Sequence, residues 1–201
     1  MEENNASNIN GEGGEKTVAV KEKKSTAATI YDMLEIFCVS IAVVMLLFTF
    51  IGRMTTVDGN SMYPTLEHGE RLWITSIGYE PDYGDVVIVH EKDGELNYPL
   101  VKRVIALGGD TIEFDFQRWE VRVNGVLLEE DYIHYEDWKS MKSYGCEETV
   151  YVPEGYVFVM GDNRNSSTDS RDSRVGFVHG DDIVGKATFR FARFGKSGFV
   201  D

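Results

Sequence analysis

A serine in the first third of the chain lies in a setting where it could act as a nucleophile. Ser61 belongs to a short segment, residues 58–66, that is rich in residues favouring turns. A serine hydroxyl attacks a carbonyl only when a neighbouring base accepts its proton. Taken alone, such a serine more often forms a turn or caps a helix. Its chemistry therefore depends on a base supplied from elsewhere in the chain.

A lysine inside an apolar run is the candidate base. Lys102 interrupts a series of strand-forming residues and would share one face of its strand with Leu100. On an edge strand it would simply extend its amine into solvent. Buried among apolar groups, its pKa would fall until the neutral amine could accept a proton. The residues alone leave both interpretations open.

A third segment, residues 161–171, is dense in hydrogen-bonding side chains. It could be an ordinary solvated loop. Acidic and basic residues nevertheless alternate along it, at Asp162, Arg164, Asp169 and Arg171. Opposite charges at such short spacing favour ion pairs inside the loop, which would hold it rigid.

Short β-strands must position these three segments. Asn124-Gly125 predicts a type I′ hairpin between two of the strands. The spacing of the strands predicts a mainly β domain, either a folded antiparallel sheet or a barrel-like one. Residues 129–148 are polar, aromatic and acidic, and we expect a loop or excursion of uncertain structure there. The predicted strands cover residues 71–75, 85–90, 100–107, 111–116, 120–128, 149–153, 156–160 and 183–191.

An uncharged apolar run precedes the β region. Residues 36–52 contain no charge and no proline, and the apolar character starts slightly earlier. This gives roughly 20 residues, the length that a helix needs to cross a bilayer core. A cleaved signal peptide would lie at the extreme N-terminus and end in a small-residue cleavage site, whereas this run begins late and lacks such a site. We therefore expect an uncleaved signal anchor.

Basic residues predict how the anchor is oriented. Four lysines precede the run and only Arg53 follows it closely, which places the N-terminus in the cytoplasm. We expect a disordered cytoplasmic tail over residues 1–28, a transmembrane signal-anchor helix over 29–53, and an extracytoplasmic β-rich domain over 54–201. The expected location is the cell membrane, crossed once. The four lysines are Lys16, Lys21, Lys23 and Lys24.

Composition excludes several classes of protein. A chain of 201 residues provides one packed domain with little to spare. The net charge of -14 argues against a nucleic-acid partner, which needs concentrated positive charge. Cys38 and Cys146 lie far apart, so there is no disulfide framework. The four histidines are scattered and no CxxC or HExxH spacing occurs, so we expect neither a metal nor a cofactor.

Taken together, these features resemble the type I signal peptidases (leader peptidases), in a short form like that of Gram-positive bacteria. The resemblance covers most of the chain from about Tyr31 to Val184, with five motifs in the family's order behind one N-terminal span. The motifs are Ser-Met-Tyr-Pro-Thr (61–65), Gly-Asp-Val-Val (84–87), Lys-Arg-Val-Ile-Ala-Leu-Gly-Gly-Asp (102–110), Gly-Asp-Asn-Arg-Asn-Ser-Ser-Thr-Asp-Ser-Arg (161–171) and Gly-Phe-Val (176–178).

The resemblance implies a serine endopeptidase with a Ser-Lys dyad. Ser61 would be the nucleophile, Lys102 the general base that takes its proton, and Ser167 the serine that orients the lysine amine. Met62 and Leu100 would contact the substrate. Four loop residues match the family's bracing pair and that pair's structural neighbours: Asp169 and Arg171, then Asp162 and Arg164.

One position departs from the family pattern. Many relatives carry a serine two residues before the nucleophile, and its hydroxyl completes the oxyanion hole. This chain has Gly59 there, so the hole would rest on backbone N–H groups, that of Ser61 among them. The glycine could instead serve a backbone angle that other residues avoid. Both alternatives are open at this point.

The implied reaction is the removal of N-terminal signal peptides from exported pre-proteins, after small residues of A-x-A type. Its partners would be these pre-proteins and the lipid bilayer, close to the secretion translocon. One rival is a self-cleaving Ser-Lys protease of related fold, but such proteins are cytoplasmic and lack an anchor. The other rival is a membrane-tethered β-domain that only binds, which cleavage assays on dyad variants would distinguish.

Overall fold

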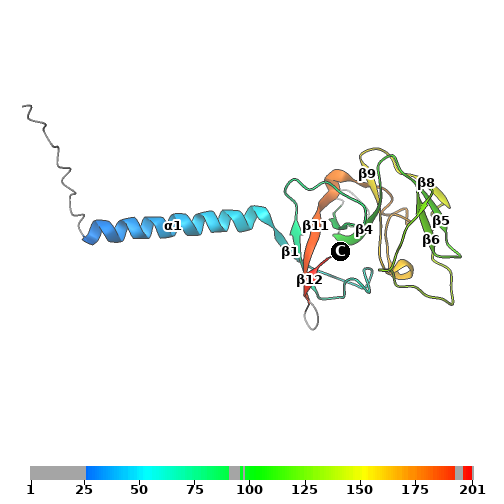
Figure 1. Cartoon of the computed structure of the whole chain (residues 1–201), viewed down its shortest axis with the longest axis horizontal. Helices are drawn as coiled ribbons and strands as arrows, with labels where there is room; N and C mark the ends of the chain where they lie inside the picture. Colours follow the sequence, from blue (N-terminus) through cyan, green and yellow to red (C-terminus); the bar gives the residue numbers. More distant parts are fainter. Residues whose placement is uncertain (1–25, 91–95, 97, 193–196, 201) are drawn as a thin grey trace, which may run out of the picture. The chain divides into compact units, whose positions relative to one another are not determined.

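The computed structural model describes residues 26–90, 96, 98–192 and 197–200 (Figure 1). Most of the predicted N-terminal tail, including its four lysines, lies outside the described residues. The chain divides into an N-terminal unit that extends to Val43 and a larger unit from Val44 onward. Each unit is described by itself.

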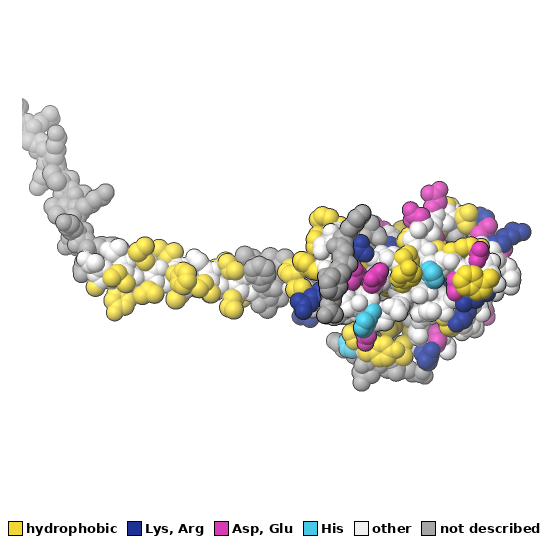
Figure 2. Space-filling model, turned by 90° about the horizontal axis from the view of Figure 1, so that it is seen from below, with side chains coloured by type: hydrophobic (Ala, Val, Ile, Leu, Met, Phe, Trp, Pro, Cys, Tyr) yellow, Lys and Arg dark blue, Asp and Glu magenta, His cyan; other side chains and the backbone are white. Residues whose placement is uncertain are grey.

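Helix α1 (Thr26–Ile51) is apolar on every side, and Figure 2 shows apolar side chains along the face in view. Within it, the 18 residues Thr29–Leu46 are long and apolar enough to cross a membrane, and none of them is buried by the rest of the chain. The 26 residues span about 39 Å, at about 1.5 Å per residue. Ser40 donates its hydroxyl to the carbonyl of Ile36 at 2.7 Å, so this polar group is satisfied inside the helix. The helix begins three residues before the start of the predicted anchor and ends two residues before the end of that anchor.

The β region forms two antiparallel sheets, which confirms the mainly β prediction. The large sheet has the order β1-β2-β11-β3-β4-β9-β10, with β12 paired to β11. In the described part of the chain β1 and β10 pair on one side only, so this sheet is open. Its strands are β1 (Arg53–Thr56), β2 (Arg71–Thr75), β3 (Val86–Val89), β4 (Leu100–Leu107), β9 (Tyr156–Met160), β10 (Val178–His179), β11 (Ile183–Phe191) and β12 (Gly198–Phe199).

The smaller sheet has the order β7-β6-β5-β8, and Figure 1 shows β5, β6 and β8 side by side. Asn124 and Gly125 connect β6 to β7 with φ angles of 52° and 79°, as a type I′ turn requires, so the predicted hairpin is present. The strands are β5 (Thr111–Asp115), β6 (Glu120–Val123), β7 (Val126–Leu127) and β8 (Thr149–Tyr151). Two short 3₁₀ helices are η1 (Arg164–Ser166) and η2 (Gly180–Asp182).

Three hydrophobic clusters hold the sheets together. One lies beneath the Ser61 segment and includes Met62, Leu66 and Leu72. The second packs the smaller sheet against β9, and the third joins β3, β4 and β9. Cys146 packs partly against the second cluster, and this burial raises the pKa of its thiol to about 11. Both cysteines are free.

The excursion over residues 129–148 contains turns but no helix or strand. It is nevertheless fixed to the rest of the domain. Its backbone joins the domain through His134 N, which donates to Asp162 O at 2.9 Å, and Met141 N, which donates to Phe116 O at 2.8 Å. This segment therefore contacts the 161–171 loop, which was not predicted.

Candidate active site

The structure brings Ser61 and Lys102 into direct contact. The Lys102 Nζ donates to Ser61 Oγ at 3.0 Å and to the carbonyl of Val101 at 2.9 Å. Strand β4 lies between β3 and β9, not at an edge, and Lys102 is only 2% exposed. The interpretation of Lys102 as an edge lysine that reaches into solvent is therefore wrong.

Burial changes the acid–base behaviour of this lysine. Loss of hydration disfavours the ammonium form and lowers the pKa of Lys102 to about 8, although the charges of Asp169 and Asp162 act in the opposite direction. Close to this pH a substantial fraction of the amine is neutral. A neutral amine in contact with a serine hydroxyl can accept its proton, which an ordinary surface lysine cannot do.

The turn that carries Ser61 is tied to the 161–171 loop. Asn163 donates its backbone N–H to Ser61 O at 3.0 Å, and its side-chain amide donates to Asn60 O at 3.1 Å. Gly59 N donates to His68 Nδ1 at 3.1 Å on the other side of the turn. The position of the nucleophile is thus set from both sides by hydrogen bonds.

Gly59 has a φ of 90°, a conformation that L side chains rarely adopt. A Cβ built there would meet no atom within 4 Å, so space does not require the glycine. The geometry thus favours the backbone-angle alternative. The N–H of Ser61 donates to no acceptor in the described part of the chain, which leaves it available to an oxyanion.

A groove of about 210 Å³ opens beside the dyad. It is bounded by the end of β1, by Tyr98 and Pro99, and by the start of β4, including Leu100. Met62 does not line it: this side chain is 1% exposed and packs in the cluster beneath the turn, and its contact with the substrate stays a prediction. Three larger hollows in the described part of the chain, of about 480, 530 and 300 Å³, contain neither dyad residue.

Ser167 is buried close to the site but does not hold the lysine amine. Its Oγ makes no hydrogen bond to Lys102 in the described part of the chain, and its hydroxyl contributes to the lowered pKa of Asp169. It lies against Gly161, where an added Cβ would come within 2.2 Å of it. The hydrogen bond from Ser167 to Lys102 that the resemblance implied is therefore absent, and the Val101 carbonyl is the other partner of the amine.

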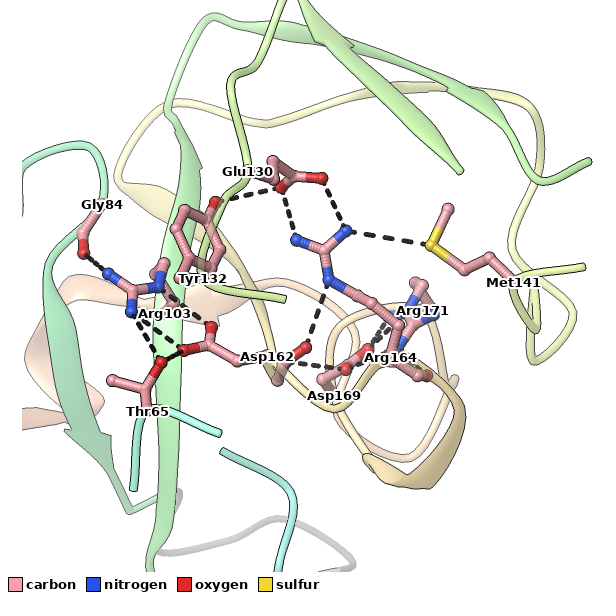
Figure 3. Close-up of polar contacts among 11 residues, drawn as sticks. Thr65, Gly84, Arg103, Glu130, Tyr132, Met141, Asp162, Arg164, Asp169 and Arg171 are labelled. Carbon is pink, nitrogen blue, oxygen red and sulfur yellow. Dashed lines mark hydrogen bonds and ion pairs between the residues drawn. The ribbon is translucent and has the colours of Figure 1, made fainter. Parts of the chain in front are cut away.

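Three buried ion pairs surround the 161–171 loop, and Figure 3 shows them side by side. The pair between Asp169 and Arg171 lies within the loop, as predicted. The other two leave it, which corrects the prediction of purely internal pairs. Asp162 binds Arg103 in β4, and Arg164 binds Glu130 in the excursion.

The Asp169–Arg171 pair is fully buried. Arg171 Nε and Nη2 donate to the two carboxylate oxygens at 2.9 and 2.8 Å, and Gly161 N donates to Oδ2 at 2.9 Å. Burial alone would raise the pKa of Asp169, but the hydrogen bonds and charge of Arg171 outweigh it and hold the pKa below its usual value. The carboxylate is therefore ionised at neutral pH.

The sequence interpretation missed the outer partners of these pairs. Arg103 directly follows Lys102 in an apolar run, and a buried arginine needs a carboxylate partner, so this signal was present. Glu130 and Tyr132 carry no such signal, because their contacts join segments far apart in the chain. Among the described residues, no group of three or more His, Cys, Asp or Glu side chains is placed to hold a metal ion.

The chain is similar in sequence to known proteins of one family. The sequence model of the family described as "Signal peptidase, peptidase S26" matches residues 30–192. A signal peptidase I of Bacillus amyloliquefaciens is 34% identical over 188 residues, which cover 90% of this chain and 94% of that protein. A probable signal peptidase I-1 of Synechocystis is 34% identical over 181 residues, covering 84% and 87%. A crystal structure of a signal peptidase I from Enterococcus faecalis matches with a TM-score of 0.44 and 30% identity, covering 55% of this chain and 98% of that one.

Proposed function

Because this chain belongs to the signal peptidase family, peptidase S26, and is a serine endopeptidase, we propose that it cleaves signal peptides with Ser61 as nucleophile and Lys102 as general base. One observation carries the proposal. A lysine amine that is almost completely buried lies 3.0 Å from a serine hydroxyl. Desolvation supplies the neutral base that this chemistry needs.

The reaction is an acyl transfer in two halves. Ser61 Oγ attacks the peptide carbonyl while Lys102 Nζ takes the hydroxyl proton, and the ammonium then gives this proton to the leaving amine. Water next attacks the acyl-enzyme, with Lys102 again accepting a proton, and Ser61 is released. The Ser61 N–H stabilises the negative charge that develops on the carbonyl oxygen, since Gly59 offers no hydroxyl.

The groove supports an extended substrate with small side chains. Strand β1 pairs only with β2 in the described residues, so its other edge is free to accept a peptide strand. Residues 98–101 form the opposite wall, where Leu100 and Val101 are partly exposed. A groove of about 210 Å³ favours small residues before the cleaved bond.

Membrane anchoring completes the proposal. Helix α1 crosses the cell membrane once, with the N-terminus in the cytoplasm and the domain from residue 54 onward outside, because the lysines gather before the helix. Enzyme and signal peptide then share one bilayer, which raises their effective concentration. Pre-proteins leaving the secretion translocon are the substrates.

The test uses the full-length enzyme in detergent with a purified pre-protein, followed by N-terminal sequencing of the product. We expect cleavage after a small residue, and its loss in both Ser61→Ala and Lys102→Ala. Lys139→Ala is the matched control, since Lys139 is an exposed lysine paired with Glu136. Undiminished cleavage by either dyad variant would falsify the mechanism.

A further inference from the structure

The Asp162 carboxylate joins the three segments that build the dyad. Arg103, the neighbour of Lys102 in β4, donates to it from Nε at 3.0 Å and from Nη2 at 2.9 Å. Thr65, in the turn of the nucleophile, donates its hydroxyl to the same carboxylate. Arg103 also donates to Gly84 O at 2.8 Å. A shift of this ion pair would therefore move the strand of the base relative to the turn of the nucleophile.

Tyr132 covers this ion pair from the excursion. Its ring centroid lies 4.0 Å from the guanidinium carbon of Arg103, a cation–π contact. Its hydroxyl donates to Glu130 Oε1 at 3.0 Å, and Glu130 in turn binds the buried Arg164. Figure 3 shows Tyr132 lying between the two pairs, so one side chain connects them.

The outer face of Tyr132 borders a hollow of about 300 Å³, which Phe199 also lines. Arg103 does not line this hollow and is only 2% exposed. Tyr132 and Thr65, which both line this hollow and contact the Arg103–Asp162 pair, therefore separate the pair from it. Replacing the ring by a smaller group would let water reach the pair.

We propose that Tyr132 is a positioning residue for the base Lys102: it keeps the Arg103–Asp162 pair closed and dry, and through this pair it fixes Lys102 against Ser61. The inference rests on the proposed function. The carboxylates that act on Lys102 are Asp169 and Asp162, and each is paired with an arginine. Water beside Asp162 would loosen its arginine and rehydrate the site, and both changes favour the ammonium form of Lys102.

The experiment measures kcat and KM against pH for the full-length enzyme in detergent with one pre-protein. For Tyr132→Leu we expect kcat near neutral pH to fall about ten-fold, within the roughly 100-fold that a misplacement of about 1 Å can cost. The midpoint of the acidic limb should move upward by about half a pH unit or more, with KM nearly unchanged. Loss of folded enzyme would lower the activity at every pH without moving the midpoint.

Phe199→Leu is the matched control, because it also replaces an aromatic ring at the same hollow and has no contact with Arg103 among those described. An unmoved midpoint in Tyr132→Leu, or an equal shift in Phe199→Leu, overturns the inference. If Tyr132→Leu does not fold, Tyr132→Met decides: it removes the ring and its contact with Arg103 while filling more of the space, and an unmoved midpoint overturns the inference. If the enzyme without any substitution does not cleave the pre-protein, the proposed function is refuted, and this inference with it.

Discussion

The burial of Lys102 lowers the stability of the folded protein. Its pKa falls from 10.5 to about 8, which corresponds to about 3 kcal/mol of lost stability at neutral pH. The sign follows from proton binding: the unfolded chain holds this proton between about pH 8 and about pH 10.5, so the free energy of unfolding rises with pH across that window. The same desolvation makes the amine usable as a base.

The pH dependence of cleavage tests this residue directly. We expect kcat/KM to rise with pH through a midpoint near the Lys102 pKa of about 8, because the ammonium form present below it cannot accept the Ser61 proton. The measurement is a pH–rate profile on a substrate without ionisable side chains near the cleaved bond. A flat profile from about pH 6 to about pH 10 would contradict a lysine base.

Gly59 provides a second test at a single residue. Gly59→Ala forces a side chain into a φ of 90°, which costs about 1–2 kcal/mol, so the thermal unfolding midpoint should fall. Gly198→Ala is the control, since its added Cβ also meets no atom within 4 Å but its φ is not in that range. Equal midpoints for the two variants would show that the angle is not what the position requires.

The contact between Ser61 and Lys102 could be expected from the sequence through the resemblance to a known family, and not from the composition of either segment alone. Their outer supports could not. Tyr132 and Glu130 act on residues 29 or more positions away in the chain, and no local pattern announces such contacts. For Met62 and Ser167 the motif predicts a role but not where the side chain lies, which the structure gives as buried in both cases.

The 161–171 loop and the three residues that follow it contain two ion pairs that can be compared. Asp169–Arg171 and Asp172–Arg174 are ion pairs with the same spacing, but the first is fully buried while the Arg174 side chain is 51% exposed. A buried charge left without its partner is far more costly than an exposed one. Comparing the two pairs therefore tests the effect of burial on stability at the same sequence spacing.

We expect Asp169→Asn to lower the free energy of unfolding by about 3–5 kcal/mol, and Asp172→Asn by about 1 kcal/mol or less. Denaturant titration of the full-length enzyme in detergent measures both. The stability that Asp169 provides should also vanish in acid, as the pH falls through its lowered pKa. Similar losses in the two variants would mean that the buried pair does not brace the loop.

Most strands were predictable from the sequence, and three short ones were not. Residues 71–75, 100–107, 156–160 and 183–191 have their predicted bounds, because each carries at least three β-branched or aromatic residues. Strands β1, β10 and β12 have only two to four residues and exist through their partners. The interior position of β4 also depends on sheet order, which local sequence does not encode.

The proposed membrane insertion of helix α1 can be tested by substitutions within the helix. Placing two arginines in the middle of α1, Phe37→Arg with Ile41→Arg, adds about 5–7 kcal/mol to the cost of insertion. We expect this variant to leave the membrane pellet on alkaline carbonate extraction, whereas Thr26→Arg at the helix end remains. Retention of both in the pellet would mean that α1 is not what holds the protein there.

The thiol of Cys146 bears on how long such an enzyme survives in its surroundings. With a pKa of about 11, only about one molecule in ten thousand carries a thiolate at pH 7, and the thiolate is the form that oxidants attack. In the proposed location outside the cytoplasm, no reducing pool would repair such damage. There, a cysteine that its packing keeps in the thiol form would make the domain resistant to oxidation without a disulfide.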